Sequence, residues 1–296
     1  MKIINPSLSA DADYVYMKSI EELQAIAMQV RRDIIRMTSD AKSGHPGGSL
    51  GCADFMTTLF FNVMNIEPDK FQMSGRGEDM FFLSNGHISP VLYAVMARRG
   101  YFPVNELATF RKIGTRLQGH PSPMLSGIRA ASGSLGQGLS VAIGAALGKK
   151  LDNDANLVYV LCGDGELQEG QNWEALMYAA AKKVDNLIAV IDYNNLQIDG
   201  TCDEVCSLGN LQDKLTAFGW TTLHVPGHDV SEVQRALYYA KTLCGQKKPV
   251  IILLKTEMGH GVDFMAGDNK WHGSVTNAEQ TQQALAQLTE TLGDYQ

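Results

Sequence analysis

The 296-residue sequence has little that would bind nucleic acid or cross a membrane. It contains no run rich in Lys and Arg, and its formal net charge is −7, which argues against nucleic acid or an acidic membrane surface as the main partner. No apolar stretch is long enough to span a bilayer, and residues 1–18 carry no apolar core of a signal peptide. We therefore expect a cytoplasmic protein, with a small anionic ligand still possible because such a ligand needs only a local site.

Cysteine is also sparse, and its spacing is uninformative. The five cysteines are scattered and odd in number, and no two of them form a CxxC pair, which argues against a disulfide framework or a zinc ribbon. Cys202 and Cys206 are close in sequence, but no second Cys/His pair lies near them, so a structural metal site there is not expected. Internal repeats and low-complexity segments are absent as well.

What the sequence does contain is an alternation of short apolar runs and helical patterns. The strand-like runs begin at residues 80, 157, 187, 221 and 250. Apolar residues recur at helical spacing over residues 19–40, 53–63, 89–98, 139–150, 173–183 and 231–243, and a surface helix is expected after residue 274. Several of the strands are apolar throughout, as strands covered on both faces must be. This predicts an α/β fold, a parallel sheet with helices on both faces, built as one domain over residues 1–296.

The strongest local signal is a strand–helix–strand unit that begins at residue 157. An apolar strand ends at a Gly-Asp-Gly turn centred on Asp164, a helix follows, and a second apolar strand ends shortly before Asn194. Because such a crossover is right-handed, the carboxyl ends of both strands meet at one edge of the sheet. We therefore expect Asp164 and Asn194 to lie side by side.

These two side chains have the chemistry of a cation site. A carboxylate and an amide oxygen, with backbone carbonyls from the next loop, form an all-oxygen shell that suits Mg²⁺ or Ca²⁺, and the flanking glycines let a phosphate approach the backbone. The plainer alternative is a strand-to-helix turn in which Asp164 only caps the helix. The Asn pair at the end of the second strand favours the metal–diphosphate interpretation.

Histidine follows glycine with unusual frequency. Five of the seven histidines do so: His45, His87, His120, His228 and His260. A histidine in a glycine turn is not filling the apolar stripe of a helix, although Gly-His turns also occur on ordinary surfaces. For His228 we expect a structural role before a helix capped by Asp229 or Ser231, and for His260 a peripheral position near the ligand edge of the sheet.

The GDG turn followed some thirty residues later by Asn194-Asn195 resembles the thiamine diphosphate motif. The resemblance implies that Asp164 and Asn194 bind Mg²⁺ or Ca²⁺ together with the backbone carbonyl of Leu196. It also implies that Gly165 lies against the cofactor's diphosphate. The motif is common to thiamine enzymes and does not choose among them.

The histidine segments are similar to transketolase in particular. SGHPGG, LSNGHISP, LQGHPS, ASGSLGQGL and WHG occur in the order of that family over nearly the whole chain. The resemblance implies a diphosphate-binding domain in which His45, His120 and His272 are catalytic. The cofactor contacts that it implies are His87, Gly133, Ser134, Leu135, Gly165, Asn194 and His272. It also places Glu169 at a subunit interface, although a carboxylate is favoured at any helix start.

The resemblance supplies an activity that explains the histidines. Transketolases transfer a two-carbon ketol unit from a ketose phosphate to an aldose phosphate, so a donor hydroxyl must lose a proton and an acceptor aldehyde must gain one. Imidazole, with an ordinary pKa of about 6.5, can do both near neutral pH. Histidines also donate hydrogen bonds to sugar hydroxyls and phosphates.

The sequence matches only the first of two domains between which transketolases hold the cofactor. The second domain grips the aminopyrimidine and supplies an activating glutamate. We therefore expect the N-terminal subunit of a split transketolase, which acts with a separate C-terminal subunit in an α₂β₂ assembly. Two alternatives stay open: the α subunit of a 2-oxo acid dehydrogenase, which shares the GDG and Asn turns, and a non-catalytic cofactor-binding paralogue. The sequence names neither the sugar donor nor the acceptor.

Overall fold

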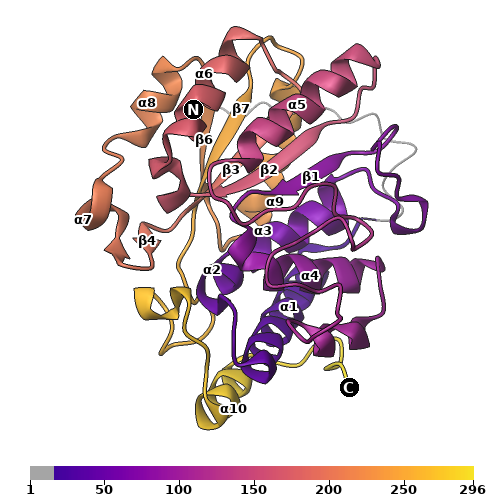
Figure 1. Ribbon diagram of the computed structural model, residues 1–296, viewed down its shortest axis with the longest axis vertical. Helices are drawn as coiled ribbons and strands as arrows, with labels where there is room; N and C mark the ends of the chain where they lie inside the picture. Colours follow the sequence, from indigo (N-terminus) through magenta and orange to yellow (C-terminus); the bar gives the residue numbers. More distant parts are fainter. Residues whose placement is uncertain (1–16) are drawn as a thin grey trace.

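The computed structural model describes residues 17–296 and contains a five-stranded sheet in the order β1-β2-β3-β7-β6 (Figure 1). The strands are β1 Met80–Leu83, β2 Val158–Gly163, β3 Leu187–Tyr193, β6 Thr221–Pro226 and β7 Val250–Lys255. Every neighbouring pair is parallel. The predicted parallel sheet is confirmed, and each strand begins within one residue of its expected start.

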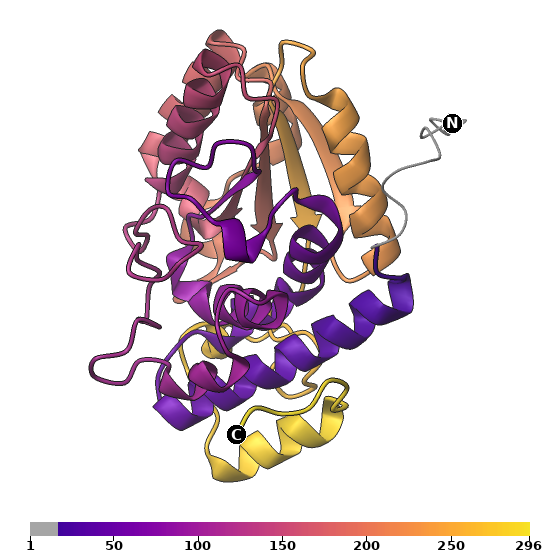
Figure 2. The same ribbon diagram turned by 90° about the vertical axis from the view of Figure 1, so that its right-hand side faces the viewer.

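Helices cover both faces of this sheet, as the apolar strands predict. One face packs against α5 (Gly138–Leu151), α6 (Gly170–Ala181) and α8 (Leu211–Ala217). The core cluster of the other face includes α3 (Ala53–Thr58), α4 (Ser89–Arg99) and α9 (Val230–Leu243), and α1 (Ile20–Ala41) packs on α3 and α4. Figure 2 shows the sheet edge-on between these layers. Along β2, Val158 and Val160 join one core cluster while Tyr159 joins the other, because successive side chains of a strand point to opposite faces.

Helix α1 ends shortly before His45, and a new helix, α2 (Pro46–Gly51), begins directly after this histidine. The start of α1 is fixed by a capping box of Ser19 and Glu22, and its end by Lys42 in the left-handed conformation. A tight turn follows, and His45 is the N-cap residue of α2. The proline at the first helical position fixes that start, because its φ already suits a helix.

The buried helix expected over residues 53–63 is interrupted. It consists of α3 followed by a π-helical turn, η2 (Leu59–Val63). Side chains of other helices take its backbone carbonyls: Arg99 Nε donates to Phe60 O, and Lys241 Nζ donates to Val63 O. The π-helical turn is therefore accompanied by hydrogen bonds from other helices, and such contacts cannot be predicted from the spacing of apolar residues.

Short elements connect the main ones. They are η3 Pro68–Lys70, η4 Gly86–Ile88, η5 Val104–Thr109, η6 Gly165–Gln168, the hairpin β4 Leu196–Gln197 with β5 Gly200–Thr201, α7 Cys202–Cys206, η7 Asn269–His272 and α10 Ala278–Gln287. The surface helix expected after residue 274 is α10, which lies beside α1 (Figure 2). Across residues 17–296 no helix is both long and apolar enough to cross a bilayer.

The segments that follow the strands carry the predicted site residues. Strand β1 leads into η4 with His87, β2 into η6 with Asp164, and β3 into the hairpin after Asn194. The loop after β7 leads to η7, which ends at His272. Since the strands are parallel, all of these segments leave the sheet at its carboxyl edge, where ligands bind in open α/β sheets.

Candidate cofactor and metal site

Asp164 lies in the turn after β2 and is only 2% exposed. Its Oδ1 accepts from the Gly165 N–H, its Oδ2 accepts from the Asn195 N–H, and its own N–H donates to the carbonyl of Asp192. These bonds hold the turn after β2 against the turn after β3, as the right-handed crossover predicts. Burial, and next the neighbouring Asp192 carboxylate, raise the pKa of Asp164 to about 7.

A cation would stabilise the two buried carboxylates of Asp164 and Asp192. Among residues 17–296 neither Asp164 nor Asp192 forms an ion pair with Lys or Arg, although both are almost fully buried. Two anionic groups in an apolar setting repel each other and lose hydration. A divalent cation with oxygen ligands would offset both costs.

Asn194 is oriented by its neighbours. Its Nδ2 donates to Asp192 Oδ2 at 2.9 Å, and its Oδ1 accepts from the Leu196 N–H at 2.8 Å. The amide oxygen therefore points away from Asp192 and lies on the turn that leads to the Leu196 carbonyl. Asp192 is held in turn by the Thr256 hydroxyl. Sequence reasoning missed Asp192, although a carboxylate near the end of an otherwise apolar strand was a signal for it.

Three predicted histidines meet beside this turn. The ring centroids of His45 and His87 are 5.1 Å apart, those of His45 and His272 5.6 Å, and those of His87 and His272 4.9 Å. Burial lowers the pKa of His45 to about 4 and that of His87 to about 3, with a further contribution from His272. All three rings are thus neutral at pH 7 and can accept protons or hydrogen bonds.

His120 belongs to a neighbouring turn rather than to this ring cluster. It lies against Gly133, where an added Cβ would come within 3.2 Å of the imidazole. Gly133 also has a φ of +141°, so this contact requires glycine. Ser134 and Leu135 follow on the surface, and the loop is therefore placed where a bound cofactor could touch it.

Glu169 is exposed and begins α6 without a side-chain cap. Its Cβ lies 2.9 Å from the position that a Cβ on Gly136 would take. It therefore stands beside the loop of Gly133, Ser134 and Leu135, and its place at a subunit interface stays a prediction.

Several buried polar atoms at this edge have no partner among residues 17–296. They are His45 Nδ1, His272 Nδ1, Asn85 Oδ1 and Ser132 Oγ. An added Cβ at Gly165 would lie 2.9 Å from Gln197 Oε1, so the turn is already crowded on its protein side. Unpaired buried polar atoms are costly, and together with the all-oxygen set at Asp164, Asn194 and Leu196 they fit a polar ligand and its cation.

Glu166 is a buried residue that sequence reasoning missed. Its carboxylate accepts from the Ser84 hydroxyl and from the N–H groups of Gly136 and Gly163. Ser84 Oγ accepts in turn from the Gly138 N–H at the start of α5. The N-cap residue of α5 gives no side-chain cap, so Glu166 and Ser84 take over that task and tie the loop to β1 and β2.

A second polar cluster, formed by Asp54, His228 and His260, has donor atoms close enough to bracket an ion. However, His228 Nε2 accepts from the Glu257 N–H at 2.7 Å, so the ring proton lies on Nδ1, which faces Asp54 Oδ2 at 3.4 Å. Neither ring nitrogen of His228 has a free lone pair for a metal. His260 stacks on His228 at 3.6 Å, and the cluster fastens the loop after β7.

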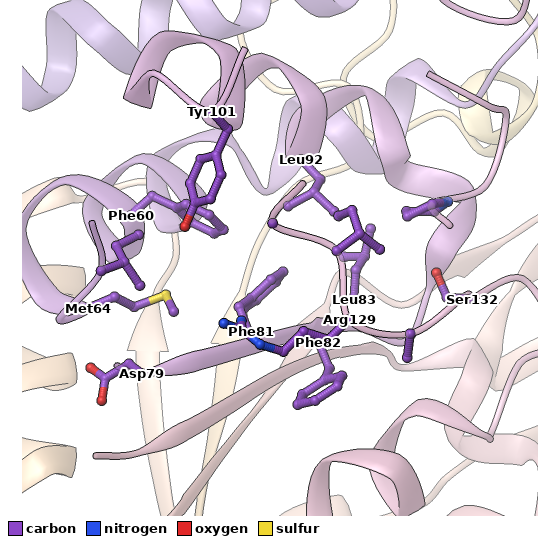
Figure 3. A pocket seen from close by; sticks show the side chains of 15 residues that line it. Phe60, Met64, Asp79, Phe81, Phe82, Leu83, Leu92, Tyr101, Arg129 and Ser132 are labelled. Atoms are coloured by element: carbon purple, nitrogen blue, oxygen red, sulfur yellow. The ribbon is translucent and has the colours of Figure 1, made fainter. Parts of the chain in front are cut away.

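The enclosed cavity beside β1 is not a ligand site. It lies between β1 and α4, with Asp79, Arg129 and Tyr101 among its lining residues (Figure 3). Its volume is about 20 Å³, which is enough for one water molecule.

Comparison with known families identifies the kind of domain. Residues 22–292 match the family described as "Transketolase, thiamine diphosphate binding domain". The chain belongs to the transketolase family. This finding also decides between the two kinds of thiamine enzyme that the GDG motif left open, in favour of transketolase.

The relatives are of two lengths. One subunit of the apulose-4-phosphate transketolase of Phocaeicola vulgatus is 37% identical over 273 residues, with 92% of this chain and 96% of that protein covered. "6-deoxy-6-sulfo-D-fructose transketolase subunit SqwG" of a Clostridium species is 40% identical over 268 residues, with 90% and 96% covered. Human transketolase is 36% identical over 272 residues, but these make up 42% of its length.

Solved transketolases share the fold. The enzyme from Leishmania mexicana has a TM-score of 0.85 at 29% identity, covering 95% of this chain and 43% of that chain. The enzyme from Campylobacter jejuni has a TM-score of 0.85 at 33% identity, covering 92% and 43%. The chain therefore has the fold of the transketolase thiamine diphosphate-binding domain and spans less than half of these full-length enzymes.

Proposed function

We propose that this chain is the thiamine diphosphate-binding subunit of a two-subunit transketolase, which transfers a two-carbon ketol unit from a ketose phosphate to an aldose phosphate. The observation that carries the proposal is the meeting of His45, His87 and His272 beside the turns of Asp164 and Asn194. A cation-and-phosphate site and a group of neutral imidazoles are thereby joined at one edge of the sheet.

In this proposal the chain's residues divide into three groups. Asp164, Asn194 and the Leu196 carbonyl hold Mg²⁺ or Ca²⁺. The cofactor contacts are His87, Gly133, Ser134, Leu135, Gly165, Asn194 and His272. When bound, thiamine diphosphate supplies the electron-accepting chemistry that cleavage beside a carbonyl needs, while His45, His120 and His272 bind sugar hydroxyls and move protons.

A separate C-terminal subunit completes the site by docking over the carboxyl edge. Two relatives that are named as single subunits of transketolases align over 96% of their own length, which supports a divided enzyme. Apolar side chains stand exposed beside the site: Ile198 is 62% exposed and lies close to Gly273, and Leu135 is 36% exposed. A partner that carries the pyrimidine-binding half would cover them.

Two such pairs would form the α₂β₂ assembly, with Glu169 at the contact between them. The substrates are sugar phosphates or similarly anionic sugars, because the two split relatives are named for a sugar phosphate and a sulfosugar. A cytoplasmic location is part of the proposal and is supported by the five cysteines, all of which are free.

The test is calorimetry on the chain co-purified with its candidate partner subunit. We expect magnesium-dependent uptake of thiamine diphosphate, loss of that uptake in Asp164→Ala, and no loss in Asp203→Ala, whose exposed carboxylate lies on α7. Ketol transfer should require both subunits. Uptake without turnover in the complex would favour a non-catalytic paralogue, and uptake unaffected by Asp164→Ala would refute the site.

A further inference from the structure

Arg111 contacts both of the turns that present substrate-side histidines. Its Nη1 donates to Ser43 Oγ at 2.8 Å, two residues before His45. Its guanidinium also packs under Gly119, the residue before His120, where an added Cβ would lie 2.7 Å from Arg111 Cζ. One side chain therefore bridges two segments that are far apart in sequence.

The backbone conformation at Arg111 directs its side chain toward the turns of Ser43 and Gly119. Arg111 has a φ of +58°, which is uncommon for a residue other than glycine. Its N–H donates to the carbonyl of Leu117 at 2.9 Å, closing the loop and bringing residue 111 back beneath Gly119. Strained backbone of this kind persists where the surrounding structure holds it, and it is frequent at functional sites.

The His120 turn is also held from helix α4. Ser89 Oγ donates to the carbonyl of Gly119, and Tyr93 OH donates to the carbonyl of Gln118. With Arg111 on the other side, the backbone just before His120 is fixed on two sides. On the Ser43 turn the Phe110 ring packs beside Gly44, and Arg111 donates the hydrogen bond to Ser43. Arg111 is the residue of this loop that contacts both the Ser43 turn and Gly119.

The guanidinium of Arg111 lies over the Phe110 ring, 5.6 Å from its centroid. Within residues 17–296 it takes part in no ion pair with a carboxylate, and its buried Nε has no hydrogen-bond partner. The titratable groups that face it are His45 and His120, with His87 and His272 behind them, and the Tyr93 hydroxyl of α4. Its positive charge is therefore directed toward imidazoles and is not neutralised.

We propose that Arg111 is a positioning residue that fixes His45 and His120 relative to each other for proton transfer. This inference rests on the proposed function of the site. The guanidinium charge also adds to burial, which is the larger cause, in lowering the pKa of both imidazoles.

The test compares Arg111→Met and Arg111→Lys in the complex with the partner subunit. Arg111→Met should lower kcat for ketol transfer roughly 10- to 100-fold, because misplaced proton-transfer groups cost that much, with a smaller change in KM. The acidic limb of its pH–rate profile should also shift to higher pH. Arg111→Lys keeps the positive charge but loses the planar set of guanidinium N–H donors. Its kcat should therefore fall, while the acidic limb of its pH–rate profile should stay at the wild-type pH.

The control is Arg116→Met on the same loop. Arg116 pairs with Glu106 and does not contact either histidine turn, so this variant should keep wild-type kcat and pH profile. A readout that needs no cofactor is the NMR titration of ¹⁵N-labelled histidines in the isolated chain. The midpoints of His45 and His120 should rise in Arg111→Met, with exposed His224 as an internal reference.

The inference is overturned if Arg111→Met and Arg111→Lys both keep kcat within twofold of wild type, or if the histidine midpoints do not move in Arg111→Met. Should Arg111→Met fail to fold, the kcat of Arg111→Lys decides. If the wild-type complex itself shows no ketol transfer, the proposed function fails, and the NMR titration still tests the placement of Arg111.

Discussion

Asp192 Oδ2 accepts a hydrogen bond from Asn194 Nδ2 at 2.9 Å, which fixes which end of the amide faces away from the sheet. With its nitrogen held by Asp192, Asn194 presents its oxygen on the other side, where the proposed metal site lies. Loss of a group that orients a metal ligand typically costs roughly 10- to 100-fold in metal affinity. Asp192 is therefore part of the metal site without being assigned as a ligand.

The variant Asp192→Asn tests this relationship. We expect the magnesium concentration for half-maximal thiamine diphosphate uptake to rise roughly 10- to 100-fold, the usual effect of losing such a group, because Asn194 can then flip. Isothermal titration of the two-subunit complex measures it. Asp203→Asn is the matched control, since Asp203 accepts from the side-chain amide of Asn195, whereas Asn195 contacts Asp164 through its backbone N–H. Equal magnesium dependence in Asp192→Asn and wild type would contradict the prediction.

Gly165→Ala separates folding from cofactor binding. The added Cβ would lie 2.9 Å from Gln197 Oε1 and 3.2 Å from Gln197 Cβ. A small shift of that side chain should keep the unfolding free energy within about 1 kcal/mol of wild type. The same crowding would distort the turn against which the diphosphate is proposed to lie, and overpacking of about 1–3 kcal/mol weakens affinity roughly 5- to 150-fold. Calorimetry and urea unfolding measure the two effects. Gly148→Ala, in open space on α5, should change neither binding nor fold.

The sequence was sufficient to place the strands and to bring Asp164 and Asn194 together. Both follow apolar strands of one right-handed crossover unit, and that rule admits few exceptions. His45, His87 and His120 stood out because a glycine turn weakens the ordinary explanation of a core imidazole, whereas His272 follows Trp271 and came from the resemblance. The resemblance to transketolase then joined segments whose spatial relation no local pattern could show.

Arg111 and Glu166 could not be found in that way. Arg111 acts on Ser43, 68 residues away, and Glu166 on Ser84, 82 residues away. Each contact depends on how irregular loops fold back on the sheet, and neither loop has a periodicity from which its path can be derived. The π-helical turn of residues 59–63 has the same origin, in hydrogen bonds from other helices.

Glu166→Gln should loosen the loop that carries Gly133 and Leu135. The amide oxygen can still accept from Ser84, but the amide nitrogen would face the Gly163 N–H, leaving a buried donor unpaired. We expect the unfolding free energy to fall by about 1–3 kcal/mol, and Glu166→Ala to cost more.

Hydrogen exchange provides the local measurement for Glu166→Gln, because the amides of Gly136 and Gly138 depend on the carboxylate and on Ser84. Both should exchange faster in the variant. Glu174→Gln on the exposed face of α6 serves as the control and should match wild type. Unchanged protection of both amides in Glu166→Gln would show that the loop is held by other contacts.

The buried histidines make folding stability depend on pH in a defined window. In the folded chain the pKa of His45 is about 4 and that of His87 about 3, whereas in the unfolded chain both return to about 6.5. Between these values the unfolded state binds protons that the folded state does not, so stability rises with pH there. The contribution is complete above pH 6.5 and is lost progressively as the pH falls toward 4. Asp164, whose pKa is raised to about 7, contributes the opposite slope in this window, so the measurement is a comparison of two proteins. Urea unfolding at a series of pH values should show stability rising less steeply with pH in His87→Gln than in wild type. His224→Gln, which leaves the cluster intact, should keep the slope; the same slope in His87→Gln would show that the ring cluster does not cause it.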